Sequence, residues 1–279
     1  MSAIVTINKH LTRVRCNNPS VMTGSGTNTY IVHDETKAWV IDPGPNEAEH
    51  VDNIFKACAG REISKVFVTH MHPDHSPAHA PICKKTGAQL IGRAPVDDPF
   101  QDQTCVPEMI AKHNEQFYLN GQAMLQAVYT PGHVDNHICY FILPSKIMIT
   151  GDHIMQGSTV VIIPPHGKMK EYIESLQLLL DYPIQQLAPG HGGMITEPVT
   201  EIKSLVEHRL SREAKVIEGL KLMSPIDTAN LVKRVYDDVD VSLHAVAEFS
   251  LLSHLIKLEV EGRASQTQQD QQTIWRFIA

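Results

Sequence analysis

Short apolar runs separated by polar turns recur along the first two-thirds of the chain and predict β-strands. Between several of these runs, apolar residues return at helical spacing with polar residues on the opposite face, which predicts amphipathic helices. The predicted strands cover residues 27–32, 37–41, 64–69, 89–92, 123–129, 138–143 and 146–150, and the predicted helices cover residues 51–58, 78–86 and 169–181. This alternation of strands and helices indicates an α/β fold.

The hydrophobic pattern changes after Pro198, where strand-like runs give way to helical spacing. The predicted C-terminal elements are helices at residues 200–222, 228–236 and 242–261, then a polar Gln-rich stretch and a strand at 273–278. This order resembles a small winged-helix module. We therefore expect a first domain at residues 1–199 and a helical C-terminal domain at residues 200–279.

Composition and charge argue against a membrane protein, a secreted protein and a general nucleic-acid-binding protein. The 279-residue chain has a net charge of −7 and is 42% hydrophobic, so it can bury a sizeable core but has no general attraction to nucleic acid or anionic membranes. No apolar run has the length of a membrane span, and the first ten residues lack the pattern of a secretory signal. We expect a soluble, cytoplasmic protein without a membrane partner. The five scattered cysteines, with no CxxC pair, are expected to be reduced thiols.

A dense cluster of metal-binding side chains follows the apolar run 66–68. The sequence Thr-His-Met-His-Pro-Asp-His at residues 69–75 places three imidazoles and one carboxylate in one loop. Neutral imidazole and carboxylate are ligands for zinc, iron or manganese. A strand that ends in such a loop can direct several side chains at one point, so the sequence predicts a metal site here.

Four further polar side chains each follow an apolar run and lie close to a glycine: Asp42, His133, Asp152 and His191. Glycine lets the backbone turn sharply as it leaves a strand and allows close approach to an ion. Because strand ends meet at the edge of a sheet, we expect these side chains to converge on the loop at residues 69–75.

Taken in order, the motifs HxHxDH, TPGH, GD and PGHG, at residues 70–75, 130–133, 151–152 and 189–192, resemble the metallo-β-lactamase superfamily. The similarity covers about residues 20–195. The C-terminal region, with Glu207-His208-Arg209 and a winged-helix-like end, resembles the β-lactamase-like protein 2 group. The resemblance implies a four-layer αββα sandwich, in which two sheets pack face to face with helices outside, and a small helical winged-helix-like domain.

The resemblance also implies a dinuclear metal site and assigns its ligands. One ion takes His70, His72 and His133, the other takes Asp74, His75 and His191, and Asp152 bridges both. The implied ions are two zinc ions, with iron or manganese as alternatives. Two divalent ions roughly 3.5–4 Å apart deprotonate a shared water, and the hydroxide is the nucleophile of a hydrolase. Asp74 is the expected catalytic residue, which orients the hydroxide and passes on a proton.

Other residues are candidates for roles beside the metals. Asp42 is expected to brace the ligand loop by hydrogen bonding. His137, four residues after His133, fits a partner of a metal ligand, a substrate contact or a core histidine. His166 and Lys168, in the sequence PPHGK, could hold an anionic substrate or belong to an exposed turn.

The substrate stays open, because one fold hosts many chemistries. The β-lactamase-like protein 2 resemblance favours the phosphodiester bond of single-stranded RNA, although the tail is acidic and offers only Trp275 and Phe277 for stacking. The sequences around His133 and His137 are also similar to those of glyoxalase II, which implies a small ester or thioester. A mononuclear iron dioxygenase of the persulfide type and a non-catalytic, metal-stabilised binding module are further alternatives. The apolar C-terminal helices leave a homodimer open.

Overall fold

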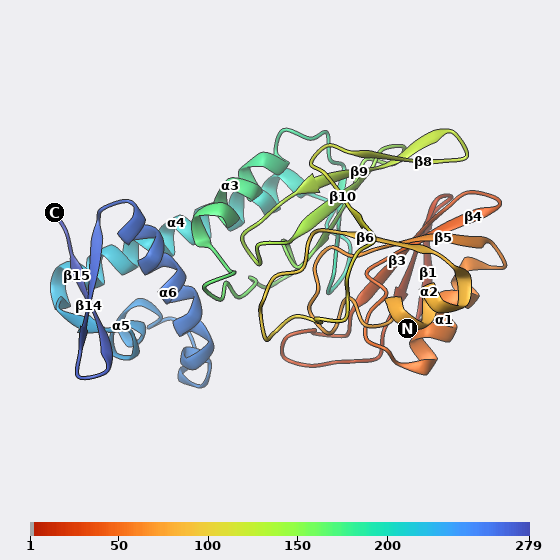
Figure 1. The fold of residues 1–279 in the computed structure, drawn as a ribbon. Helices are drawn as coiled ribbons and strands as arrows, with labels where there is room; N and C mark the ends of the chain where they lie inside the picture. The colour runs from red at the N-terminus through yellow and green to blue at the C-terminus, as the bar shows by residue number, and fades with distance from the viewer. Residues whose placement is uncertain (1–2) are drawn as a thin grey trace. The chain divides into compact units, whose positions relative to one another are not determined.

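The computed structural model describes residues 3–279, which form two compact units (Figure 1). The first unit comprises the described residues up to Thr130 together with Asn136–Thr159 and Pro183–Pro198, and the second comprises Pro131–Asp135, Val160–Tyr182 and Val199–Ala279. The second unit therefore includes two segments that lie within the first of the two domains predicted from the sequence. The division of the chain into domains at residue 199 stays a prediction.

A seven-stranded mixed sheet and two helices form much of the first unit. Their bounds are β1 (Ile4–Asn8), β2 (Leu11–Arg15), β3 (Asn28–His33), β4 (Lys37–Ile41), α1 (Ala48–Cys58), β5 (Glu62–Phe67), α2 (His79–Thr86), β6 (Gln89–Gly92) and β7 (Met109–Ile110). The strands follow one another in sequence order across the sheet. Pairing is antiparallel from β1 to β4 and parallel from β4 to β7. Parallel neighbours need crossover connections, and α1 and α2 supply two of them.

A five-stranded sheet completes the first unit. Its strands are β8 (Gln116–Leu119), β9 (Gln122–Tyr129), β10 (Ile138–Ile142), β11 (Ile147–Gly151) and β12 (Gln186–Pro189). They lie in the order β12-β11-β10-β9-β8, and the β11–β12 pair is parallel, with Gly151 opposite Pro189. These two strands therefore end at the same edge, which matters for the site described below.

Buried side chains fill the space between the two sheets and the space under the helices. Between the sheets, the rings of Phe67 and Tyr140 meet with centroids 5.2 Å apart. On the other face of the seven-stranded sheet, Ile54 of α1 packs in a second buried cluster. Successive side chains of a strand point to opposite faces, so Ile41 enters the first cluster and its neighbour Val40 enters the second. Figure 1 shows α1 and α2 on the face of this sheet turned away from β9 and β10.

The second unit consists mainly of helices. Its elements are α3 (Met169–Leu179), α4 (Pro198–Met223), β13 (Ile226–Asp227), α5 (Thr228–Val235), the 3₁₀ turn η1 (Val241–Leu243), α6 (His244–Val260), β14 (Ala264–Gln269) and β15 (Gln272–Phe277). The Asp227 side chain accepts from the backbone N of Asn230 and caps α5. Leu220, Leu255 and Trp275 lie in the buried core shared by the helices and the β14–β15 hairpin. This order of elements agrees with the helices, the polar stretch and the final strand expected from the sequence.

The segment Val241–Val260, formed by η1 and α6, is the one helix of residues 3–279 with the length and composition of a membrane span. A membrane span is not expected from the sequence, and α6 carries fully buried His254 and Leu255 among other core residues. A polar side chain buried in protein is typical of a helix packed within a domain. The same segment exposes Val246 and Phe249, but the homodimer considered for these helices stays a prediction.

The structure contains some strands that the sequence analysis does not predict. The β1–β2 hairpin is not predicted, because Lys9 and Arg13 interrupt its apolar pattern and β1 is a half-buried edge strand. The polar stretch at residues 265–272 supplies most of β14 and the hairpin turn. Asp270 and Gln271 adopt positive φ values of 48° and 66° there, as a two-residue hairpin turn requires.

Candidate metal centre

The histidine loop begins where β5 ends, in the parallel part of the seven-stranded sheet. The backbone N of His75 donates to the carbonyl of His72 at 2.9 Å, so the chain turns back on itself. This turn gathers His70, His72, Asp74 and His75 in one place. His70 and His75 are buried, whereas the Asp74 side chain is 27% exposed. Asp74 is therefore the acidic side chain of the loop that solvent can reach.

The shared edge of β11 and β12 brings Asp152 and His191 to the same place, because the two strands run parallel. Gly190 lies between them and leaves no room for a side chain. A Cβ atom at this position would lie 2.7 Å from Oδ1 of Asp152 and 2.7 Å from Cε1 of His75. The glycine next to the last histidine thus permits close approach of three neighbouring side chains.

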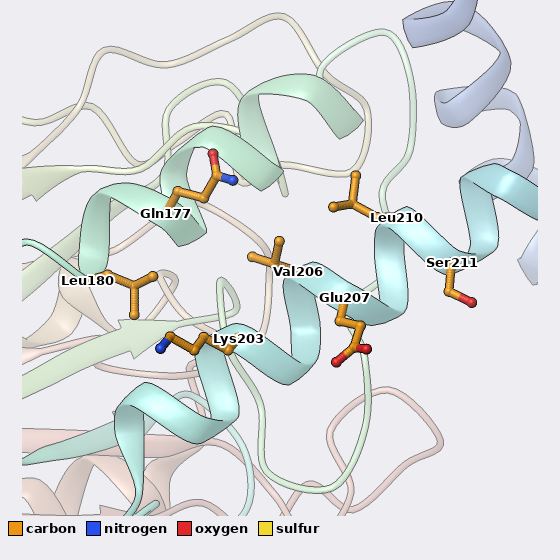
Figure 2. Close-up of a pocket in the computed structure, with 7 residues that line it drawn as sticks. All are labelled: Gln177, Leu180, Lys203, Val206, Glu207, Leu210 and Ser211. Carbon is orange, nitrogen blue, oxygen red and sulfur yellow. The ribbon is translucent and has the colours of Figure 1, made fainter.

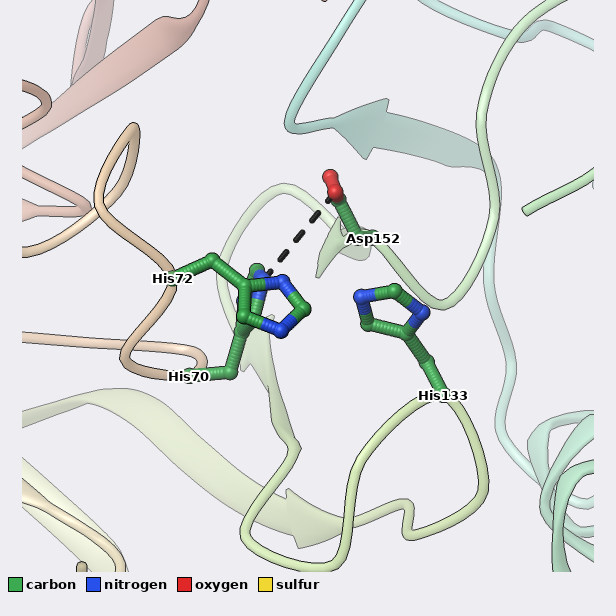
Figure 3. A group of neighbouring side chains, drawn as sticks. All are labelled: His70, His72, His133 and Asp152. Carbon is green, nitrogen blue, oxygen red and sulfur yellow. Dashed lines mark hydrogen bonds and ion pairs between the residues drawn. The ribbon is translucent and has the colours of Figure 1, made fainter. Parts of the chain in front are cut away.

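Two groups of side chains have the geometry to hold a metal ion. The first group is His70, His72, His133 and Asp152, and the second is Asp74, His75, Asp152 and His191, with the ligand atoms of each group within 4.8 Å of one another. Figure 3 shows the first group gathered around a common point. The two groups contain all seven residues that the resemblance assigns as metal ligands. Each residue is in the group that the resemblance gives it, and Asp152 belongs to both groups. That they bind metal stays a prediction.

Carboxylates and imidazoles of the second group are in direct contact. Nε2 of His191 lies 3.1 Å from Oδ2 of Asp74 and 3.3 Å from Oδ1 of Asp152. Burial alone would lower the pKa of His191, but the Asp152 carboxylate raises this pKa to about 9. Burial alone would likewise raise the pKa of Asp74, but His75 and His191 hold it well below its usual range. The carboxylates thus favour positive charge at this place, and a donor set of carboxylates and imidazoles fits a divalent cation.

Asp42 lies beside the histidine loop and hydrogen-bonds to it at three atoms. Its carboxylate accepts from the backbone N and from Oγ1 of Thr69, each at 2.7 Å, and Nδ1 of His75 lies 3.0 Å from Oδ2. Because a carboxylate only accepts, His75 carries a proton on Nδ1 and turns Nε2 to the second group. Asp42 belongs to neither metal group and braces the loop.

Thr69 and Asn28 support the ligands, although the sequence did not single them out. Oγ1 of Thr69 donates to Asp42, so it accepts from Nδ1 of His70, 3.0 Å away. The Asn28 amide donates to the carbonyls of Pro189 and Gly192, which flank His191. Their positions in the sequence were the only signal: Thr69 directly precedes the first histidine, and Asn28 is the first residue of a strand that is buried along its whole length.

The remaining predicted residues lie in different surroundings. His137 is completely buried, with its ring centroid 5.3 Å from that of His70 and Nδ1 3.0 Å from Oγ1 of Thr130. This position fits a partner packed beside a metal ligand and a core histidine equally, so the role of His137 stays a prediction. In the second unit, Nδ1 of His166 and Nζ of Lys168 lie 2.9 and 2.6 Å from the carboxylate of Asp135. An anionic substrate would have to compete with this carboxylate.

A separate groove of about 500 Å³ lies between α3 and α4 (Figure 2). Its lining residues are Gln177, Leu180, Lys203, Val206, Glu207, Leu210 and Ser211. Its lining contains no histidine and a single carboxylate, that of Glu207, so it does not offer the ligand set of a metal site.

Residues 22–191 match the metallo-β-lactamase superfamily, and residues 228–275 match the β-lactamase-associated winged helix domain. The chain belongs to the metallo-β-lactamase superfamily. It is a hydrolase of the metallo-β-lactamase fold with a C-terminal winged-helix domain, and the expected fold class is confirmed. Its His/Asp groups are compatible with a divalent metal site.

Relatives and solved structures support the same assignment along most of the chain. The Beta-lactamase-like protein 2 homolog of Drosophila melanogaster is 28% identical and aligns with 94% of this chain and 91% of its own. The Atrochrysone carboxyl ACP thioesterase nsrC of Aspergillus novofumigatus is 29% identical over 78% of this chain and 65% of its own. A β-lactamase domain protein from Burkholderia ambifaria shares the fold with a TM-score of 0.82, 18% identity and coverage of 99% and 93%.

Proposed function

We propose that this superfamily member is a dinuclear metal-dependent hydrolase of ester or thioester bonds. The observation that supports it is the pair of His/Asp groups that share Asp152. When bound there, two divalent ions, of which zinc is our first choice, would activate a water and stabilise the anion formed on attack. The division into two groups with one common carboxylate favours two ions over one.

Within this proposal, the protein's own residues have separate tasks. Asp42 fixes His75 directly and His70 through Thr69, so both groups keep their Nε2 atoms turned inward. Asp74 combines a low pKa with partial exposure, so it stays ionised and can accept a hydrogen bond from the attacking water. We assign Asp74 the role of orienting that water and passing its proton on.

The chemistry of two rim loops favours an acyl substrate. We define these loops as residues 17–26 and 94–107. The first meets His191, because the carbonyl of Gly26 lies 3.4 Å from Nδ1 of His191. The second is tied to the histidine loop, because the backbone N of Asp102 donates to the carbonyl of Met71.

Neither rim loop contains a lysine or an arginine, and the second contains three aspartates. Both expose apolar side chains instead, with Met22 57% and Phe100 53% exposed. A nucleic acid backbone requires cations, whereas an acyl group gains free energy by covering apolar surface. The relatives include a protein named as an acyl-carrier-protein thioesterase, which supports the same class of substrate.

The test is hydrolysis by zinc-loaded protein of acyl thioesters and aryl esters of increasing chain length. Asp74→Ala serves as the inactive control, and a labelled single-stranded RNA is assayed in parallel. Turnover of the acyl substrates by the wild type and not by the variant supports the proposal. Cleavage of RNA alone, by protein shown to hold its metal, would replace it with the second candidate.

That second candidate is cleavage of single-stranded RNA, which the winged-helix domain favours, since such domains can guide a strand. Within residues 228–279, acidic residues outnumber basic ones, so the domain lacks the charge expected of a general RNA-binding surface. Persulfide oxygenation has less support. The ETHE1 structure from Myxococcus xanthus, at 23% identity and a TM-score of 0.57, shares the fold alone.

A further inference from the structure

The loop that carries His133 packs against helix α3 within the second unit. Gly132 has φ 134°, and a Cβ there would lie 2.2 Å from Cα of Tyr172, so only glycine permits this contact. The backbone N of Lys168 donates to the carbonyl of Gly132 at 2.8 Å, and Oγ of Ser175 donates to that of Pro131 at 2.8 Å. The loop Pro131–Asp135 is therefore fixed by contacts with α3 and with Lys168, the residue that precedes this helix.

The ring of His133 is oriented by the backbone of the following segment. Nδ1 of His133 lies 3.0 Å from the carbonyl oxygen of Val161. A carbonyl only accepts, so Nδ1 carries the proton and Nε2 is left as the ligand atom. The position of the Val161 carbonyl thus decides both the tautomer and the direction of the imidazole.

Side chains from α4 and α6 fix the segment that contains Val161. The Arg209 guanidinium, on a residue that is 3% exposed, donates to the carbonyl of Val160 at 2.6 Å. On α6, Oγ of Ser250 accepts from the backbone N of Ile162 at 3.4 Å. Ser253, also on α6, accepts from the backbone N of Met169 at 2.9 Å. The donors and acceptors on both sides of Val161 therefore come from the C-terminal helices.

Burial of the Arg209 guanidinium costs free energy, because the charge loses its contact with water. Nε of Arg209 is buried without a hydrogen-bond partner, and the guanidinium lies 5.1 Å from the Tyr172 ring centroid. A hydrophobic side chain of similar length would avoid the desolvation cost. The planar, cationic guanidinium donates a short hydrogen bond to the carbonyl of Val160, which a hydrophobic side chain cannot do. Val160 directly precedes Val161, the residue whose carbonyl orients His133.

We propose that Arg209 is a positioning residue for the metal ligand His133, supported by Ser250 and Ser253. Through the backbone at Val160 and Val161, these residues of the C-terminal helices set the tautomer and direction of the imidazole. The inference rests on the proposed function only in taking His133 as a metal ligand. Removal of such outer partners lowers metal affinity by roughly 10- to 100-fold.

The experiment measures zinc affinity and stoichiometry by competition with a chromophoric chelator in the full-length protein. Arg209→Gln is compared with Arg212→Gln, a matched control one turn along α4. Arg212 is also buried, and it donates to the carbonyl of Val235 at 2.6 Å, away from Val160. We expect Arg209→Gln to weaken the first group by about 10- to 100-fold and leave the second unchanged. Arg212→Gln should keep both affinities, even with a comparable loss in Tm.

Two further variants keep the test decisive if Arg209→Gln folds poorly. Arg209→Lys retains a cationic donor and should recover part of the affinity, and Ser253→Ala should lower it by a smaller factor. In the metal-free protein, NMR detection of His133 should show the proton on Nδ1 in the wild type and a mixture of tautomers in Arg209→Gln. Wild-type zinc affinity and an unchanged tautomer in the Arg209 and Ser253 variants would overturn the inference.

Failure of the proposed function has a different signature. If His133→Ala retains full zinc affinity at both groups, His133 is not a ligand and the assumption shared with the proposed function is wrong. If zinc binds and responds to Arg209 but no ester or thioester is hydrolysed, the substrate proposal fails while the positioning role stands.

Discussion

The carboxylate of Asp42 lies 3.0 Å from Nδ1 of His75 and also accepts from Oγ1 of Thr69, which in turn meets His70. One buried carboxylate therefore supports a ligand in each of the two metal groups. Asp42→Asn would put an amide in this place, and one of its two oxygen acceptors would be replaced by a donor. We expect zinc affinity to fall by about 10- to 100-fold at both groups. Chelator competition measures this, with the exposed Asp52→Asn as a control that should match the wild type.

Loss of the Asp74 side chain should abolish turnover with little effect on folding. Asp74 is the partly exposed acid of the histidine loop, and positioned acid–base groups contribute roughly 10²- to 10⁴-fold to rate. The kcat of Asp74→Ala on the substrate found for the wild type, together with its circular dichroism spectrum, measures both effects. Full activity in this variant would show that another residue orients the water.

Substitution of Gly190 by alanine should disrupt both metal groups by steric contact. The added Cβ would lie 2.7 Å from Asp152, the residue common to both groups. We expect zinc stoichiometry to fall below that of the wild type. Gly87→Ala is the comparison, since no atom lies within 4 Å of its Cβ and only the strain of a positive φ remains. Normal zinc content in Gly190→Ala would mean that β12 can shift to make room.

The stability of the protein should decline below pH 6.5 because of buried His50. Burial lowers the pKa of His50 from 6.5 to about 4, so the folded protein keeps this side chain neutral while the unfolded chain protonates it. The stabilising contribution is complete above pH 6.5 and is lost as the pH falls towards 4, by about 3 kcal/mol in full. Unfolding midpoints of metal-free wild type and His50→Gln between pH 4 and 7.5 measure it. Parallel curves would exclude His50 as the cause.

The apolar rim should control the preference for acyl chain length. Met22→Ser and Phe100→Ser remove exposed apolar surface from the two rim loops without touching a metal ligand. We expect KM for long acyl substrates to rise several-fold, while kcat and the constants for acetyl substrates stay close to wild type. Equal changes for long and short substrates would remove the rim from substrate recognition.

The sequence predicts the central strands of the first unit well because their apolar runs are continuous. Lys37–Ile41 and Gln89–Gly92 have the predicted bounds. The sequence also predicts the seven candidate ligands, because they occur in recognisable motifs and follow directly after strands. The supporting contacts are different. The partners of His133 are a backbone carbonyl and an arginine far along the chain, and no local pattern records such a pairing.

His75 and His191 meet at 3.3 Å although 116 positions separate them in the chain, and β12 is the last strand of its sheet to be synthesised. Contacts of such long sequence separation form late in folding, because the chain loses the entropy of closing a large loop before the contact can stabilise it. The histidine loop alone can offer an ion only its local ligands. The second group, Asp74, His75, Asp152 and His191, is complete only after β12 joins β11, so an ion held by all four of its ligands would report that this late strand pairing has formed.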